Sequence, residues 1–162
     1  MASITFKKGE DYALKLSRLA AGSDEIAKKA IYEGAGIVAD EVRKGLESVP
    51  VDKFRFLKDD EQMHVLSKEQ KDDLLGALGV TPIKIEASGD INAKIGFDGY
   101  GSKPTKAYPK GVPNQLLARA VESGSSVRTK HPFVRPAVNA MKIKAKAEME
   151  KIIDREIEKI MK

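Results

Sequence analysis

Side chains able to carry acid–base or metal chemistry are few and dispersed along the sequence. Carboxylates cluster at 59–61 and 72–73, and the two histidines are His64 and His131. Paired carboxylates do acid–base work when burial drives their pKa values apart, whereas adjacent acids in lysine-rich polar stretches are typically solvated. Neither histidine stands at a metal-binding or catalytic spacing from another such residue. We therefore predict solvated acids, surface or packing histidines, and neither a catalytic nor a metal site.

Two further routes to catalysis or cofactor binding are also absent from the sequence. The chain has no cysteine, so it lacks disulfides, thiolate metal sites and a cysteine nucleophile. Residues 96–103 have the glycine content of a phosphate-binding loop, but they end in Gly-Ser-Lys and Pro104 follows. A phosphate-binding loop needs the lysine before a serine or threonine, at the start of a helix. We expect a protein that is not an enzyme and holds no cofactor.

Positive charge is concentrated in one part of the chain. The net charge is +5, but residues 100–146 contain ten basic side chains and one acid, Glu122. Such a block favours an oppositely charged partner, nucleic acid or an acidic protein surface, although a solvated lysine-rich face has the same composition. Because the charges extend over two expected loops and two expected helices, they favour nonspecific contact over base readout. The candidate basic surface comprises Lys103, Lys106, Lys110, Arg128, Lys130, Lys142, Lys144 and Lys146.

Composition and hydropathy indicate a folded domain away from membranes. The chain has 162 residues, of which 41% are hydrophobic and 33% charged, as in folded globular proteins. No apolar run approaches the roughly 20 residues that span a membrane, and the first residues lack the apolar stretch of a secretory leader. We expect an intracellular product without membrane contact.

Hydrophobic periodicity predicts helices in the first half of the chain. Spacings of three and four residues indicate a short helix over 9–21, broken at Gly22, and a longer one from residue 24 to Pro50. Gly34 and Gly36 lie inside the longer helix, and we expect them to permit close packing by another backbone.

The middle of the chain predicts a helix and then a hairpin. Residues 67–70 form a capping box, from which a helix should run until Gly79 stops it. Over 83–97 apolar and polar residues alternate around Ser-Gly-Asp at 88–90, which indicates an antiparallel hairpin with one apolar face. A glycine- and proline-rich loop over 98–113 follows, and we expect it to contact partners, together with the loop at 124–132.

Two helices are expected in the last third. Pro113 suits the first turn of a helix that ends at Gly124, and Pro136 suits the start of a second that reaches Met161. The apolar stripe of this second helix packs either wholly on the chain's own helices or partly on a neighbouring subunit. Together the elements predict one α+β domain over 1–162, with helices packed on a small antiparallel sheet.

Residues 118–138, ARAVESGSSVRTKHPFVRPAV, resemble minor tail or neck components of long-tailed bacteriophages and prophages. Residues 132–137 match the family's Pro-Phe-hydrophobic-Arg-Pro-Ala element, which leads into a C-terminal helix. Residues 122–125 match its Glu-aromatic-Gly-Thr element in part, because the aromatic and the threonine are missing. The resemblance places the candidate motif at Glu122, Gly124, Pro132, Phe133, Arg135 and Pro136.

The resemblance implies a structural virion protein that acts in tail completion or head–tail joining. Such proteins assemble as homo-oligomers, often rings, with adjacent neck or tail proteins, in the host cytoplasm and then in the virion. In the motif, two prolines with fixed φ angles should hold a turn that buries Phe133, while Arg135 clamps either a carbonyl at the turn or a carboxylate such as Glu122. The alternative function is a nonspecific nucleic-acid-binding module that uses the basic segment 100–146.

Overall fold

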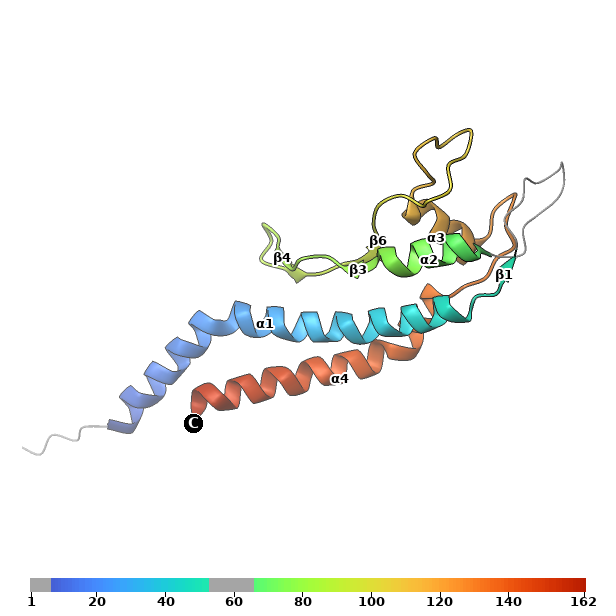
Figure 1. Ribbon diagram of the computed structural model, residues 1–162. Helices are drawn as coiled ribbons and strands as arrows, with labels where there is room; N and C mark the ends of the chain where they lie inside the picture. The colour runs from blue at the N-terminus through green and yellow to red at the C-terminus, as the bar shows by residue number, and fades with distance from the viewer. Residues whose placement is uncertain (1–6, 53–65) are drawn as a thin grey trace, which may run out of the picture.

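A computed structural model describes residues 7–52 and 66–162, of which 7–10 are described through their backbone (Figure 1). Within these ranges the class is α+β, as the sequence predicts, with two long helices and small two-stranded sheets, of which β3–β6 and β4–β5 are antiparallel and β1–β2 is parallel. The helices are α1 (Lys7–Ser48), α2 (Lys68–Ala77), α3 (Asn114–Ser123) and α4 (Val134–Met161). The strands are β1 (Val51–Asp52), β2 (Leu66–Ser67), β3 (Leu78–Val80), β4 (Lys84–Ile85), β5 (Ile91–Asn92) and β6 (Ile95–Phe97).

An antiparallel pair of helices, α1 and α4, forms a long arm (Figure 1). The 28 residues of α4 extend about 42 Å at 1.5 Å per residue. Lys29 of α1 binds Glu156 of α4 at 2.8 Å, and Lys15 reaches the carbonyl of Lys162. Most of the predicted α4 stripe is buried or half-buried, including Ala145 and Ile152, and it packs on the chain's own α1.

The predicted break at Gly22 is wrong, because α1 continues from Lys7 to Ser48. One glycine costs a helix only about 1 kcal/mol, and Ile160 of α4 packs over Gly22. Gly34 does admit a close neighbour, but it is a side chain and not the predicted backbone: a Cβ would lie 2.6 Å from Met149 Sδ and 3.7 Å from the Ala145 carbonyl oxygen. The prediction of close packing fails for Gly36, where a Cβ would meet nothing within 4 Å.

The hydrophobic core lies at one end of the arm, where the last turns of α1 meet α2, α3, β6 and the start of α4. Its members include the fully buried Val42, Leu46 and Leu74. The predicted capping box starts α2: Gln70 N–H donates to Ser67 Oγ, and Ser67 N–H donates to Gln70 Oε1, both at 3.2 Å. These local bonds orient α2 on the core.

The predicted hairpin forms, but its pairing extends further back along the chain. β4 pairs with β5, whereas β6 pairs with β3, which the sequence assigns to the end of the preceding helix. That helix ends at Ala77, because Leu78 adopts extended backbone and packs beside Phe97 in the core. The apolar face is only partly covered: β3 and β5 contact α1, but Ile85 remains 47% exposed.

The last two helices begin close to their predicted positions. Pro113 precedes α3, and Gly124 ends it with a φ of 79°, a conformation that glycine adopts without strain. α4 begins at Val134, two residues before the predicted Pro136. Pro136 nevertheless lies in the first turn, where backbone N–H groups have no helical partner, so its missing N–H removes no bond.

Candidate functional site

Glu122 joins the end of α3 to the start of α4. Its carboxylate accepts backbone N–H groups from Phe133 at 2.7 Å, Val134 at 2.8 Å and Arg135 at 3.0 Å. These donors are among the four that an α-helix leaves without an internal partner at its N-terminus. A negative charge there is also favoured by the helix dipole. Glu122 therefore caps α4 from a different helix.

The predicted clamp between Arg135 and Glu122 is present but loose. Arg135 Nε lies 3.9 Å from Glu122 Oε1, and the Arg135 side chain is 70% exposed. The expected carboxylate, Glu122, does lie beside Arg135, but the main partners of Glu122 are three backbone N–H donors. A carboxylate eleven residues before the cap has no sequence signature, so the motif match was the available signal.

The pKa of Glu122 reflects opposing influences. Burial is the largest and acts to raise the pKa, because the charged form loses hydration. The backbone donors of Val134, Phe133 and Arg135, with the Arg135 charge, act in the opposite direction and leave the pKa below its usual value. The ionised carboxylate is thus the form that the fold stabilises.

Phe133 sits in the core, as the motif predicts. Its side chain is 2% exposed, and its ring meets the ring of Phe97 edge to face at a centroid distance of 5.9 Å. Gly45 of α1 lets the turn approach, because a Cβ there would lie 3.0 Å from the Phe133 carbonyl oxygen. Pro132 and Pro136 on either side are exposed. The motif is a joint that fixes α4 relative to α1, α3 and the antiparallel strand pairs β3–β6 and β4–β5, which we call the ribbon.

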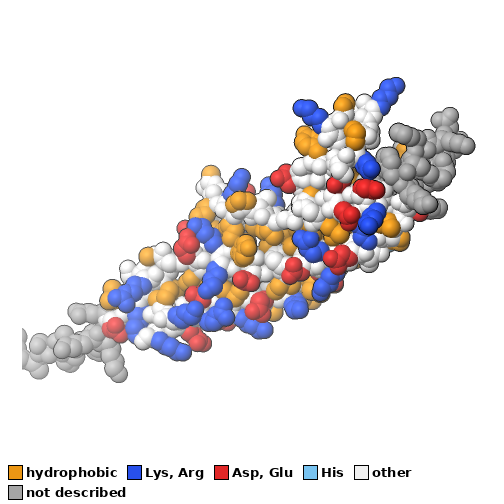
Figure 2. All heavy atoms as spheres, viewed as in Figure 1, with side chains coloured by type: hydrophobic (Ala, Val, Ile, Leu, Met, Phe, Trp, Pro, Cys, Tyr) orange, Lys and Arg blue, Asp and Glu red, His pale blue; other side chains and the backbone are white. Residues whose placement is uncertain are grey.

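The predicted basic surface is divided in space. Lys103, Lys106 and Lys110 belong to a loop that projects beyond α3, whereas Lys142, Lys144 and Lys146 lie on α4, across α1 from it (Figure 1). On the face in Figure 2, Lys and Arg side chains along the arm alternate with Asp and Glu. The basic residues therefore do not form one continuous patch.

Arg128 is a correction to the predicted surface, because its side chain is buried. The residue is 8% exposed, and Nη2 donates to Gln70 Oε1 at 2.9 Å, the oxygen that also serves the α2 capping box. Burial lowers the pKa of the guanidinium. Arg128 connects the loop after α3 to the start of α2, while neighbouring Lys130 is exposed as predicted.

The acidic and histidine candidates serve the fold where they are described. Asp73 accepts Ser102 N–H at 2.7 Å and Ser102 Oγ at 2.9 Å, which anchors the projecting loop on α2. His131 donates its backbone N–H to the Val121 carbonyl at 2.7 Å. The cluster at 59–61 and His64 lie outside the described residues. Over 7–52 and 66–162, no three His, Asp or Glu side chains gather as a metal site would require.

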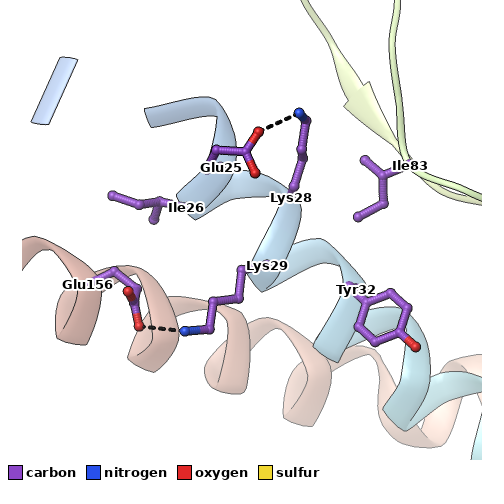
Figure 3. A pocket seen from close by; sticks show the side chains of 7 residues that line it. All are labelled: Glu25, Ile26, Lys28, Lys29, Tyr32, Ile83 and Glu156. Carbon is purple, nitrogen blue, oxygen red and sulfur yellow. Dashed lines mark hydrogen bonds and ion pairs between the residues drawn. The ribbon is translucent and has the colours of Figure 1, made fainter. Parts of the chain in front are cut away.

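A cleft of about 420 Å³ lies where the ribbon meets the arm (Figure 3). Its charged side chains are paired: Lys28 binds Glu25 at 2.6 Å, and Lys29 binds Glu156 at 2.8 Å. Lys159 also binds Glu156 at 2.8 Å, and hydrogen bonds from Lys159 and Lys29 lower the pKa of Glu156 to about 2. The Lys29–Glu156 ion pair at this cleft therefore connects α1 to α4.

A second cleft, of about 680 Å³, follows the outer face of the β3–β6 pair. The cross-strand partners Gly79 and Gly96 lie in it, and Thr81, Lys94 and Gln115 are among its other lining residues. The sequence analysis missed this feature. A glycine inside a strand pattern is a known sign of close approach by another group, and Gly96 was such a glycine, whereas Gly79 was assigned to a helix end.

No protein-family model, curated protein or solved structure matches this chain. The resemblance of residues 118–138 to phage tail and neck components therefore stays a prediction. Among the described helices, none combines the length and apolar character needed to cross a bilayer.

Proposed function

We propose that this chain is a structural protein of a phage or prophage virion, acting in tail completion or head–tail joining. The observation that carries the proposal is the arm of α1 and α4. Outside the core cluster, the buried apolar side chains described on it are Ala30, Ala145 and Ile152. An arm with so little interior of its own is suited to packing against other proteins.

Exposed apolar side chains on the arm support the same proposal. Tyr12 and Leu16, one helical turn apart near the free end of α1, are 56% and 43% exposed, and Ile143 on α4 is 76% exposed. Figure 2 shows hydrophobic side chains exposed along the arm between the charged ones. Exposed apolar side chains such as these are available to pack against another protein. Homo-oligomers and adjacent neck or tail proteins are the partners that the proposal implies.

The joint formed by the motif residues gives a physical reason for the motif in an assembling protein. Glu122 and Phe133 fix the direction of α4 relative to the core. A protein that repeats around a symmetric assembly must present its arm at the same angle in every copy, because a small error accumulates around the assembly. The joint therefore supports a role for the motif in assembly geometry without direct partner contact.

The test is to interrupt the gene in its genome and image the particles by electron microscopy. We expect filled heads and free tails that remain unjoined, and restoration by the wild-type gene. Glu150→Ala, on the exposed face of α4, should restore joining fully, whereas Phe133→Ala should not. Normal joined particles from the interrupted gene would overturn the proposal, as would gene neighbours without portal, capsid or tail-tube functions.

The alternative function, a nonspecific nucleic-acid-binding module, draws support from the basic residues alone. The division of those residues between the projecting loop and α4 does not favour it, since one strand of nucleic acid would have to contact both sides of the molecule. Binding that weakens steeply with salt would support the alternative.

A further inference from the structure

Gly79 of β3 and Gly96 of β6 face each other across the antiparallel pair, and a Cβ at either would meet nothing within 4 Å. Neither φ angle is positive, so the backbone conformation does not require glycine. Glycine inside a strand costs roughly 0.5–1 kcal/mol relative to alanine. The chain's own packing therefore offers no reason for the pair, and we call this bare stretch of backbone the glycine shelf.

The glycine shelf has the size and shape to receive a large side chain. Its cleft has a volume of about 680 Å³. Leu78 and Phe97 beside the glycines are buried in the core, and Phe97 also lines the cleft. Because neighbouring residues of a strand point to opposite faces, a side chain at either glycine would point away from the faces of Leu78 and Phe97. An aromatic ring laid over a strand glycine replaces the packing that the missing side chain would have supplied. An aromatic side chain placed there would lose contact with water over the part of its surface that is exposed.

The same chain presents an exposed aromatic on a projecting loop. Tyr108 is 38% exposed, and residues 102–110 extend away from the body (Figure 1). Thr105 and Tyr108 exchange backbone hydrogen bonds at 3.0 and 3.1 Å, which closes the tip of the loop. Gly101 N–H donates to the Val112 carbonyl at 2.8 Å, and Asp73 holds Ser102 at the base. Because the loop is already ordered, docking it requires little further loss of entropy.

We propose that the glycine shelf receives Tyr108 from the projecting loop of a second copy of this chain. The loop of the same chain does not occupy the shelf, because the space above both glycines is empty. The two surfaces are complementary in charge: residues 102–110 carry three lysines and no acid, whereas residues 84–98 carry three acids and two lysines. In Figure 2 the far end of the loop shows Lys and hydrophobic side chains without acidic ones.

The contact is head to tail, because the loop and the shelf are different surfaces of each copy. Repeated head-to-tail contacts close into a ring when the rotation per copy permits, and otherwise extend into a filament. The inference rests on the proposed function in that it names the copy-to-copy contact. It is judged by self-association of the purified chain, whereas the virion role is judged by particle joining, so either can fail alone.

The test uses sedimentation velocity of the full chain and five single variants. Gly96→Val fills the shelf, and Gly79→Thr fills it from the other strand. Both residues favour strands, and both side chains enter open space, so thermal unfolding should stay at or above the wild-type midpoint. Tyr108→Ser removes the docking ring, and Tyr108→Phe keeps it. Gly76→Ala, another glycine with open space but outside the cleft, is the matched control for the shelf.

We expect wild type, Tyr108→Phe and Gly76→Ala to associate as the concentration rises. Gly96→Val, Gly79→Thr and Tyr108→Ser should associate at least about 30-fold more weakly, since a tyrosine anchor is commonly worth 2 kcal/mol or more. An equal mixture of Gly96→Val and Tyr108→Ser should form a species of twice the chain mass and none larger. In that mixture one chain has an intact loop and the other an intact shelf.

Three results would overturn the proposal. The first is a wild-type chain that stays monomeric into the millimolar range. The second is association of Gly96→Val and Gly79→Thr equal to wild type, which would place the contact elsewhere. The third is a loss of self-association in Tyr100→Ser that Tyr108→Ser does not show. Tyr100 lies at the base of the loop, bridged to Pro113, so this result would place the docking side chain at the base and not at Tyr108.

Discussion

Replacing Glu122 with alanine tests the joint between α3 and α4 most directly. The carboxylate accepts three backbone N–H groups at 2.7, 2.8 and 3.0 Å, and its side chain is 11% exposed. Loss of an N-cap side chain costs about 0.5–2 kcal/mol, and a hydrogen bond to a charged group contributes about 1.5–3 kcal/mol. We expect Glu122→Ala to lower the free energy of unfolding by about 3 kcal/mol, because the donors are left near the core.

The assay is thermal and urea unfolding followed by circular dichroism. For a domain of this size, a loss of about 3 kcal/mol corresponds to a fall of about 6–12 °C in the unfolding midpoint. Arg135→Ala should cost less than about 1 kcal/mol, because Arg135 is exposed and 3.9 Å from the carboxylate. Glu150→Ala, a glutamate 64% exposed on α4, is the control and should change little.

The same residue makes stability depend on pH in a defined direction. The pKa of Glu122 is lowered from 4.5, so the folded chain binds this proton less tightly than the unfolded chain. Its contribution is therefore complete above about pH 4.5 and is lost as the pH falls through the lower, folded pKa. Glu122→Gln removes this dependence on pH. The difference in free energy of unfolding between this variant and wild type should therefore become smaller in acid. If Arg135→Ala lowered the free energy of unfolding as much as Glu122→Ala does, the reasoning would be refuted. It would also be refuted if the difference between Glu122→Gln and wild type became larger in acid.

Three further predictions concern packing and charge. Gly45→Ala should destabilise the fold by about 1–3 kcal/mol, because its Cβ would lie 3.0 Å from the Phe133 carbonyl oxygen. Gly36→Ala in the same helix should instead stabilise it by up to about 1 kcal/mol, and equal effects of the two variants in urea unfolding would contradict this. Phe133→Ala should cost about 3–5 kcal/mol and expose hydrophobic surface to a dye, and a change below about 1 kcal/mol would place the ring outside the core. Charge reversal at Lys142, Lys144 and Lys146 should leave stability unchanged, and any DNA binding at low salt should weaken in a filter assay; unchanged binding would exclude α4 as a nucleic-acid contact.

Elements built from local bonds could be predicted closely from the sequence. The capping box at Ser67 and Gln70 forms with both of its bonds, and α3 lies between Pro113 and Gly124 as predicted. The long C-terminal helix and the 83–97 hairpin also form. In each case the deciding contacts join residues within a few positions of one another, or follow a period that one strand or helix displays by itself.

The errors arose where a distant segment decided the outcome. α1 continues through Gly22, whose cost of about 1 kcal/mol is small, and Ile160 from far along the chain lies against it. Leu78 leaves α2 for β3 because Phe97 offers a partner in the core. Arg128 looked like a surface charge by composition, but Gln70 accepts its guanidinium and the core edge covers it. None of these partners has a fixed spacing from the residue that it affects.

The same distinction between local and distant contacts applies to the candidate site. Residue types and order alone indicated that Phe133 and the two prolines form one turn, because proline geometry and the apolar ring are local properties, while Glu122 was indicated by the resemblance. Only the folded chain decided that Glu122 binds three backbone donors, that the basic block separates into a loop and a helix, and that two glycines share an open shelf. These outcomes depend on which surfaces meet, and hydrophobic burial, which drives that meeting, has no fixed sequence separation.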